Sequence, residues 1–139
     1  VQATPLLMAS VAQGIANGGV VSPTPVAIEK DLQSDREPIR VTSKKTAAQV
    51  GELMVAVVTQ GTGFAAAISE GQVAGKTGTA QTGNDNPSVA WFVAFAPAQA
   101  PTIAVAVVVE EGGSAGQEAA GGTVSAPIAR AMMEAALRK

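Results

Sequence analysis

The fold of this chain is decided by residues 88–110, SVAWFVAFAPAQAPTIAVAVVVE. Two apolar segments, 88–96 and 102–110, flank a proline-containing turn at 97–101, which predicts two adjacent antiparallel strands. Both faces of each segment are apolar, with large side chains on one face and an alanine-rich opposite face, so we expect helices packed closely on the sheet. A third extended segment, residues 73–81, precedes them and is dense in Gly and Thr.

Three helices are predicted around this sheet. The first follows the start signal Thr4-Pro5, and the third is expected to be capped by Ser125. The second runs from Ser43 to Gly61, although its β-branched run at 55–58 also fits a strand. The side chains expected to face inward are Leu7, Val11 and Ile15 in the first helix, Ala47, Val50, Met54, Val57 and Val58 in the second, and Ile128, Met132 and Ala136 in the third. The order helix, helix, three strands, helix predicts an α+β fold with an antiparallel sheet flanked by helices.

The segments between these elements are predicted to be irregular. Residues 20–29 contain Pro23 and Pro25, which allow only an edge or irregular strand. Residues 31–40 are the most charged stretch and are expected to form a solvated loop. Residues 110–122 are expected to form a flexible, glycine-rich loop.

The composition excludes several classes of protein. The chain has 139 residues, 47% of them hydrophobic, which suits one globular domain and not a disordered segment. The absence of Cys and His excludes disulfides, thiol nucleophiles, a Ser-His-Asp triad and His-ligated metals. A pI near 5.0 and 3% aromatic residues argue against nucleic acid as a partner. The longest apolar run, 103–109, is too short to span a membrane. Because the chain begins at Val1, directly before a helix start, we expect it to be part of a longer protein.

Three short motifs have plainer explanations than the chemistry they imitate. Residues 112–116 fit the G-x-S-x-G nucleophile elbow, but no His follows, so a glycine-rich loop is the better interpretation. Residues 61–66 imitate a dinucleotide fingerprint, but a glycine turn ending the second helix is simpler. Residues 71–77 resemble a P-loop with only three residues between the glycines, where the phosphate cradle needs four.

The remaining candidate is Lys76-Thr77-Gly78-Thr79 on an extended segment. Alternation along a strand places Lys76 and Gly78 on one face and Thr77 and Thr79 on the other. With a local twist, the ammonium and both hydroxyls could bind a carboxylate. An edge strand protected by Lys and Gly explains the same residues equally well. The residues alone leave both interpretations open.

A resemblance favours the first interpretation. Lys76-Thr77-Gly78 is the third signature of the serine penicillin-recognising enzymes, and the whole chain resembles the transpeptidase domain of class B penicillin-binding proteins. The matching segments, in the family's order, are residues 4–9, 15–19, 61–63, 73–81 and 90–97. The composition, rich in Ala, Val and Gly, resembles that of the actinobacterial penicillin-binding protein A group.

The departures from the family pattern indicate which part of the domain is present. No Ser in the chain is followed by Lys three residues on, and none by Asn two residues on. The family carries Ser-x-x-Lys and Ser-x-Asn before the segment that matches at Thr4. We therefore expect residues 1–139 to be the C-terminal portion of a serine penicillin-binding protein/β-lactamase-like domain, with three of its five strands. The nucleophile would lie in an N-terminal part absent from this chain, which would be inactive alone and held to that part non-covalently.

The resemblance also implies a reaction and its residues. The activity would be that of a peptidoglycan D,D-transpeptidase, acting through an acyl-serine and inhibited by β-lactams. Lys76 and Thr79 would be catalytic, the Thr79 N–H being one oxyanion donor. Thr77, Gly78 and Thr79 would bind substrate, without a metal or organic cofactor. A D,D-carboxypeptidase, a β-lactamase or a penicillin-sensing receptor domain remain alternatives.

The same resemblance implies partners and a location. The ligands would be peptidoglycan stem peptides and β-lactams, and the protein would work with cell-wall synthesis proteins in cell division or the maintenance of cell shape. It would act on the extracytoplasmic face of the bacterial membrane, anchored by a segment outside this chain. Nucleic acid is not expected as a partner.

Overall fold

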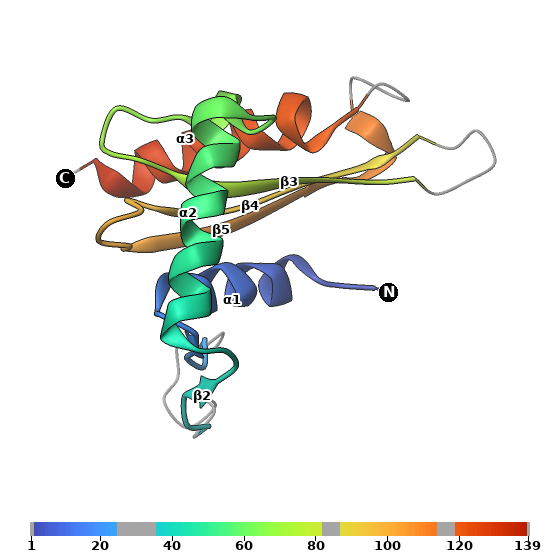
Figure 1. The fold of residues 1–139 in the computed structure, drawn as a ribbon. Helices are drawn as coiled ribbons and strands as arrows, with labels where there is room; N and C mark the ends of the chain where they lie inside the picture. Colours follow the sequence, from blue (N-terminus) through green and yellow to red (C-terminus); the bar gives the residue numbers. More distant parts are fainter. Residues whose placement is uncertain (1, 25–35, 82–86, 114–118, 139) are drawn as a thin grey trace.

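The computed structural model describes residues 2–24, 36–81, 87–113 and 119–138 (Figure 1). The elements in chain order are α1 (Pro5–Ala16), β1 (Val20–Val21), β2 (Ile39–Arg40), α2 (Lys44–Gln60), the 3₁₀ turn η2 (Phe64–Ala66), β3 (Ala74–Ala80), β4 (Val89–Ala96), β5 (Ile103–Val109), the π-helical turn η4 (Gly121–Ser125) and α3 (Ala126–Leu137). The α+β class, the three helices and the three consecutive strands are confirmed. Within the described residues, no helix is both long and apolar enough to cross a membrane.

The predicted irregular segments are described only in part. Val20–Val21 and Ile39–Arg40 pair as a short antiparallel ladder, so the predicted loop at 31–40 ends in a strand. The predictions for residues 25–29 and 31–35 lie outside the described residues. The same holds for 114–118 of the predicted loop at 110–122, and that loop ends earlier than expected, where η4 begins.

The main sheet is antiparallel in the order β3-β4-β5, with β3 at an edge. Thr77 pairs with Phe92, and Gly78 pairs with Trp91, so the two pairs point to opposite faces. β5 follows β4 through the short turn at 97–101, as predicted. The register therefore fixes which side chains of β3 belong to each core.

Each face of the sheet has its own core, and helices cover both (Figure 1). On one face, Phe92 and Met133 are fully buried between the sheet and α3. On the other, Phe95 and Ala74 pack with Met54 of α2, and Ile15 of α1 joins them. The alanines of β4 and β5 leave room for these helices to approach closely.

Helix α2 crosses the outer edge of β3 near the start of the strand and so passes from one face of the sheet to the other (Figure 1). Near its middle, Met54 contacts the core that contains Ala74. One turn later, Val58 belongs to the core of Phe92 on the opposite face. A Cβ placed on Gly75 would lie 3.2 Å from Val58 Cγ2. The helix therefore covers the start of β3 and leaves the rest of that strand uncovered.

The predicted inward face is confirmed for α2 and wrong for α3. In α2, Ala47, Met54 and Val58 are buried, and the predicted limits of the helix are confirmed, with Ser43 as its N-cap and Gly61 as its C-cap. In α3 the buried residues are Ala126, Ala129 and Met133, while the residues expected inside lie outside: Ile128 is 44% exposed, Met132 is 47% exposed and Ala136 is exposed. The helix begins at Ala126, directly after Ser125 as expected, so only the buried face differs: two small alanines and Met133 pack inward, and Ile128 and Met132 do not.

Two further details of the helix predictions are wrong. Ser125 does not cap α3 with its side chain. It is fully buried and donates to the Ala90 carbonyl at 2.9 Å. In α1 the cap at Thr4 is confirmed, but Leu7 and Val11 are 54% and 43% exposed. Ala12 is buried and Ile15 is packed against the core of Phe95, whereas Leu7 and Val11 line an open groove of about 560 Å³ against β1 and β2.

Candidate active site

The four residues singled out from the sequence lie in the middle of β3, on the sheet edge. Lys76 and Thr79 are exposed, and Thr77 and Gly78 are half-buried. The register confirms the alternation: Lys76 lies on the face of Val93, and Thr77 on the face of Phe92. In the described part of the chain, β4 is the only strand that pairs with β3. The outer edge of β3 beyond Gly75 is therefore not covered by a neighbouring strand.

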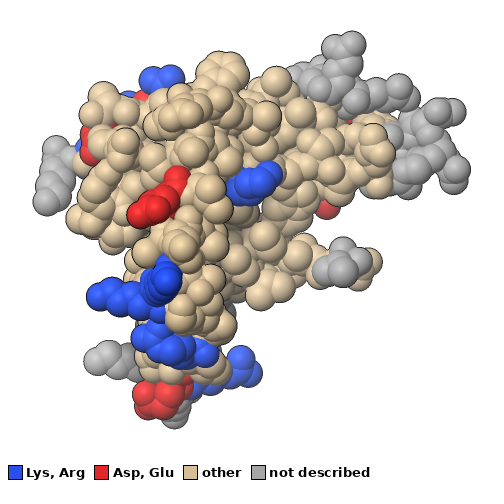
Figure 2. Space-filling view, in the orientation of Figure 1, with Lys and Arg blue, Asp and Glu red and all other residues tan. Residues whose placement is uncertain are grey.

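The Lys76 ammonium lies close to the strand itself. Nζ donates a hydrogen bond to the Thr77 carbonyl oxygen at 2.6 Å. Neither of the ion pairs among the described residues includes Lys76. The surface over the sheet carries few charged side chains, whereas basic side chains gather at the end formed by β2 and the start of α2 (Figure 2). The Lys76 charge is therefore available to an anionic ligand at the edge.

The Thr77 hydroxyl has a partner from another element. Thr62 follows α2 directly, and its Oγ1 lies 2.8 Å from Thr77 Oγ1. A Cβ on Gly122 would lie 3.5 Å from the Thr77 methyl group. The hydroxyl of Thr77 thus contacts the turn after α2, and its methyl group faces the glycine-rich turn at Gly122.

The backbone of β3 at Gly78 is held by the turn η4. A Cβ on Gly121 would overlap the Trp91 carbonyl oxygen and lie 2.7 Å from the Gly78 oxygen. A Cβ on Gly78 would lie 3.2 Å from Trp91 Cβ, close but without severe overlap. Glycine at 121 therefore serves the close approach of η4 to the strand. The small size of Gly78 leaves the strand backbone accessible beside Thr79.

Sequence reasoning missed three residues around this strand: Thr62, Gly121 and Gly122. Thr62 belongs to the segment 61–63, which the sequence indicates only as a turn that ends the second helix and as one of the segments that match the family. Gly121 and Gly122 were assigned to a flexible loop because paired glycines suggest conformational freedom. Here their lack of side chains permits backbone contact with Trp91 and Thr62.

The exposed part of β3 has the groups needed to bind an extended peptide that carries a carboxylate. An uncovered strand edge can pair with an extended peptide through main-chain hydrogen bonds. One ammonium and two hydroxyls beside that edge suit a ligand that carries a carboxylate. The strand is held by β4 along its paired edge, by α2 at its start and by η4, so its open edge is fixed in place. The described residues therefore support a peptide-carboxylate site.

Comparison with known proteins identifies the class. The family model described as the penicillin binding protein transpeptidase domain matches residues 1–134. The chain belongs to this family. It is 44% identical to peptidoglycan D,D-transpeptidase PbpA of Mycolicibacterium smegmatis over 98% of this chain and 30% of that protein. It is 33% identical to stage V sporulation protein D of Bacillus subtilis over 99% of this chain and 23% of that protein.

Solved structures agree with this assignment. The ceftriaxone acyl-enzyme complex of penicillin-binding protein A from M. tuberculosis has a TM-score of 0.76 and 43% identity, over 97% of this chain and 32% of that one. The D,D-transpeptidase domain of a peptidoglycan glycosyltransferase from Eggerthella lenta has a TM-score of 0.71 and 36% identity, over 99% of this chain and 34% of that one. These matches confirm the predicted fold and the resemblance to the penicillin-binding protein A group. The chain spans about a third of the length of these relatives.

Proposed function

We propose that this chain is the C-terminal portion of a transpeptidase domain that cross-links peptidoglycan through a serine ester. The observation that carries the proposal is the uncovered edge of β3, which presents Lys76-Thr77-Gly78-Thr79 beyond the cover of α2. Relatives named peptidoglycan D,D-transpeptidases support the same activity. Solved neighbours named as β-lactam acyl-enzyme complexes support inhibition by that class of compound.

The stem peptide of the donor strand binds antiparallel to β3 and extends the sheet. Gly78 allows the peptide backbone to approach, because it places no side chain on the strand. The hydroxyls of Thr77 and Thr79 bind the carboxylate of the terminal D-alanine, or that of a β-lactam. The Lys76 ammonium adds a positive charge near this carboxylate and assists proton transfer.

The reaction consists of two acyl transfers. A serine hydroxyl attacks the carbonyl carbon before the terminal D-alanine, the C–N bond breaks, and D-alanine leaves with a proton. The amine of a second stem peptide then attacks the ester carbon, forms the cross-link and releases the serine. The Thr79 N–H donates to the oxyanion in both steps, and removal of one such donor typically slows the reaction by about 10²- to 10³-fold.

The serine lies in chain outside these residues, since neither Ser-x-x-Lys nor Ser-x-Asn occurs among them. An N-terminal part of the domain supplies both motifs and remains bound non-covalently where the two parts are separate chains. The complete protein works on the extracytoplasmic face of the membrane, anchored by a segment outside this chain, together with cell-wall synthesis proteins. The relatives, about three times as long as this chain, have room for these parts.

The test is the intact mass of the denatured protein before and after incubation with benzylpenicillin. We expect a penicilloyl adduct on a co-purifying N-terminal chain, with this 13.8 kDa chain unmodified. An adduct on this chain would refute the assignment of the serine. A lone 13.8 kDa species in native size-exclusion chromatography would refute the non-covalent pairing. The absence of any adduct on the complete domain would refute the proposed activity.

A further inference from the structure

The turn after α2 places one polar side chain against the candidate site. Thr62 lies between Gly61 and Gly63, and its hydroxyl oxygen is 2.8 Å from that of Thr77. The two residues are 15 positions apart in the chain, and Thr62 itself lies off the strand that would pair with a ligand. The contact is therefore made by one side chain from outside the strand.

Close backbone contacts fix the position of Thr62. The Gly63 N–H donates to the Val57 carbonyl at 2.9 Å, which holds the turn against the end of α2. A Cβ on Gly61 would lie 3.0 Å from the same carbonyl oxygen. On the opposite side, a Cβ on Gly122 would overlap the Thr62 carbonyl oxygen. Gly61, Gly63 and Gly122 thus allow α2 on one side and η4 on the other to hold the Thr62 backbone. The fixed backbone keeps the Thr62 hydroxyl beside Thr77.

We propose that Thr62 is a positioning residue that orients the Thr77 hydroxyl toward the substrate carboxylate. This inference rests on the proposed function, in which Thr77 binds that carboxylate. A hydroxyl has one donor hydrogen and two acceptor lone pairs. When Thr62 donates to Thr77 Oγ1, the Thr77 hydrogen remains free to donate to the anion. The opposite direction would turn only lone pairs toward the carboxylate.

The ligand therefore selects one direction of the hydrogen bond. A carboxylate can only accept, so binding requires Thr77 to donate outward and Thr62 to donate to Thr77. Hydrogen bonds arranged in such a chain polarise one another, which strengthens the contact to the anion. Thr62 is expected to matter for ligands with a carboxylate and not for uncharged ligands at the same position.

The test compares acylation rates of the complete transpeptidase domain with benzylpenicillin and with its methyl ester, which lacks the anionic carboxylate. We expect Thr62→Val and Thr62→Ala to slow acylation by benzylpenicillin by about 2- to 10-fold, the usual range for loss of one neutral hydrogen bond. Acylation by the ester should be unchanged, and Thr62→Ser should restore the wild-type rate. In a Thr77→Val background, Thr62→Val should have no further effect.

Thr59→Val is the matched control, because Thr59 is exposed and its hydroxyl donates to the Val55 carbonyl within α2 at 3.1 Å. It should acylate as the wild type does with both compounds. Equal slowing of acid and ester by Thr62→Val, or losses that add to those of Thr77→Val, would overturn the inference. A wild-type domain that is acylated normally, with Thr62→Val and Thr62→Ala unaffected, would overturn this inference alone. A wild-type domain that is never acylated would overturn the proposed function and this inference with it.

Discussion

The first two residues of β3 and the five that follow share one strand but have opposite surroundings. Ala74 and Gly75 are buried between α2 and the sheet. Residues 76–80 are exposed or half-buried and lie beyond α2. The change from Ala-Gly to Lys-Thr-Gly-Thr occurs where the helix cover ends. The buried end fixes the position of the strand, and the exposed end presents its backbone and polar groups to a ligand.

The largest expected effect is at the buried end. The ring of Phe92 lies against Gly75, is fully buried, and packs with Val58 and Met133. Phe92→Ala should lower the free energy of unfolding by about 3–5 kcal/mol, because a cavity replaces the ring. Urea titration of the complete domain measures this change. A loss below about 1 kcal/mol would show that the two ends of β3 do not differ as described.

At the exposed end of β3, a change in the backbone should affect the acylation rate much more than the stability of the domain. Thr79→Pro removes the proposed oxyanion donor and should slow acylation by about 10²- to 10³-fold. Proline is tolerated on an outer strand edge, so the unfolding midpoint should change little. Thr79→Ala is the control, since it keeps the N–H and loses only the hydroxyl. Similar acylation rates for both variants would contradict the proposed role of the Thr79 N–H.

Substitutions at two glycines of β3, one at each end, compare the buried start of the strand with its exposed end. A Cβ on Gly75 would clash with the Phe92 ring, so Gly75→Ala should destabilise the domain by about 1–3 kcal/mol. At Gly78 the nearest atom would be Trp91 Cβ at 3.2 Å, so Gly78→Ala should affect stability less and slow acylation more. Thermal unfolding and penicillin labelling of both variants give the comparison. A larger loss of stability for Gly78→Ala, or a larger loss of acylation rate for Gly75→Ala, would contradict this difference between the two ends.

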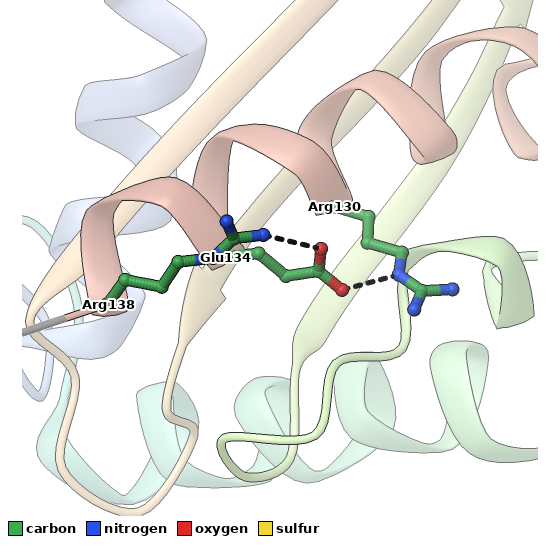
Figure 3. Close-up of polar contacts among 3 residues, drawn as sticks. All are labelled: Arg130, Glu134 and Arg138. Atoms are coloured by element: carbon green, nitrogen blue, oxygen red, sulfur yellow. Dashed lines mark hydrogen bonds and ion pairs between the residues drawn. The ribbon is translucent and has the colours of Figure 1, made fainter.

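The smallest effect is expected on the outer surface of α3, far from both ends of β3. Arg130 Nε lies 2.7 Å from Glu134 Oε1, and Arg138 Nη2 lies 3.9 Å from Glu134 Oε2 (Figure 3). Both arginines are well exposed, so Glu134→Gln should cost no more than about 0.5 kcal/mol. Urea titration at low and high salt checks this value. A larger loss would show that α3 contributes to the sheet's stability through its charges.

The sequence predicted the sheet more accurately than the helix faces. The predicted strands at 73–81, 88–96 and 102–110 differ from the observed strands by at most one residue at each end, because runs bounded by Pro, Gly and Ser define strands well. In α3 the spacing of Ile128, Met132 and Ala136 predicts the inner face, whereas the small side chains of Ala126 and Ala129 are buried there with Met133. In α1, large side chains were expected inside, whereas the alanine-rich sheet accepts small ones.

The candidate site was also only partly predictable. The Lys76–Thr79 motif and its alternation follow from the sequence, because strand geometry is regular. Its location at an uncovered edge does not, since that depends on where α2 ends relative to β3. The contact between Thr62 and Thr77 joins segments 15 residues apart across two turns, and no sequence periodicity encodes it.

Because α2 crosses the edge of β3, it also limits the length of a strand that can pair with this edge. An added strand that ran past Lys76 toward Gly75 would meet α2, which packs against the start of β3 (Figure 1). Residues 76–80 offer a pairing length of about 16 Å at roughly 3.3 Å per residue. A longer polymer must leave at the Ala80 end or bend away from the sheet. The same helix therefore limits the length over which an added strand can pair with β3 and keeps this edge from joining the long flat edge of another sheet.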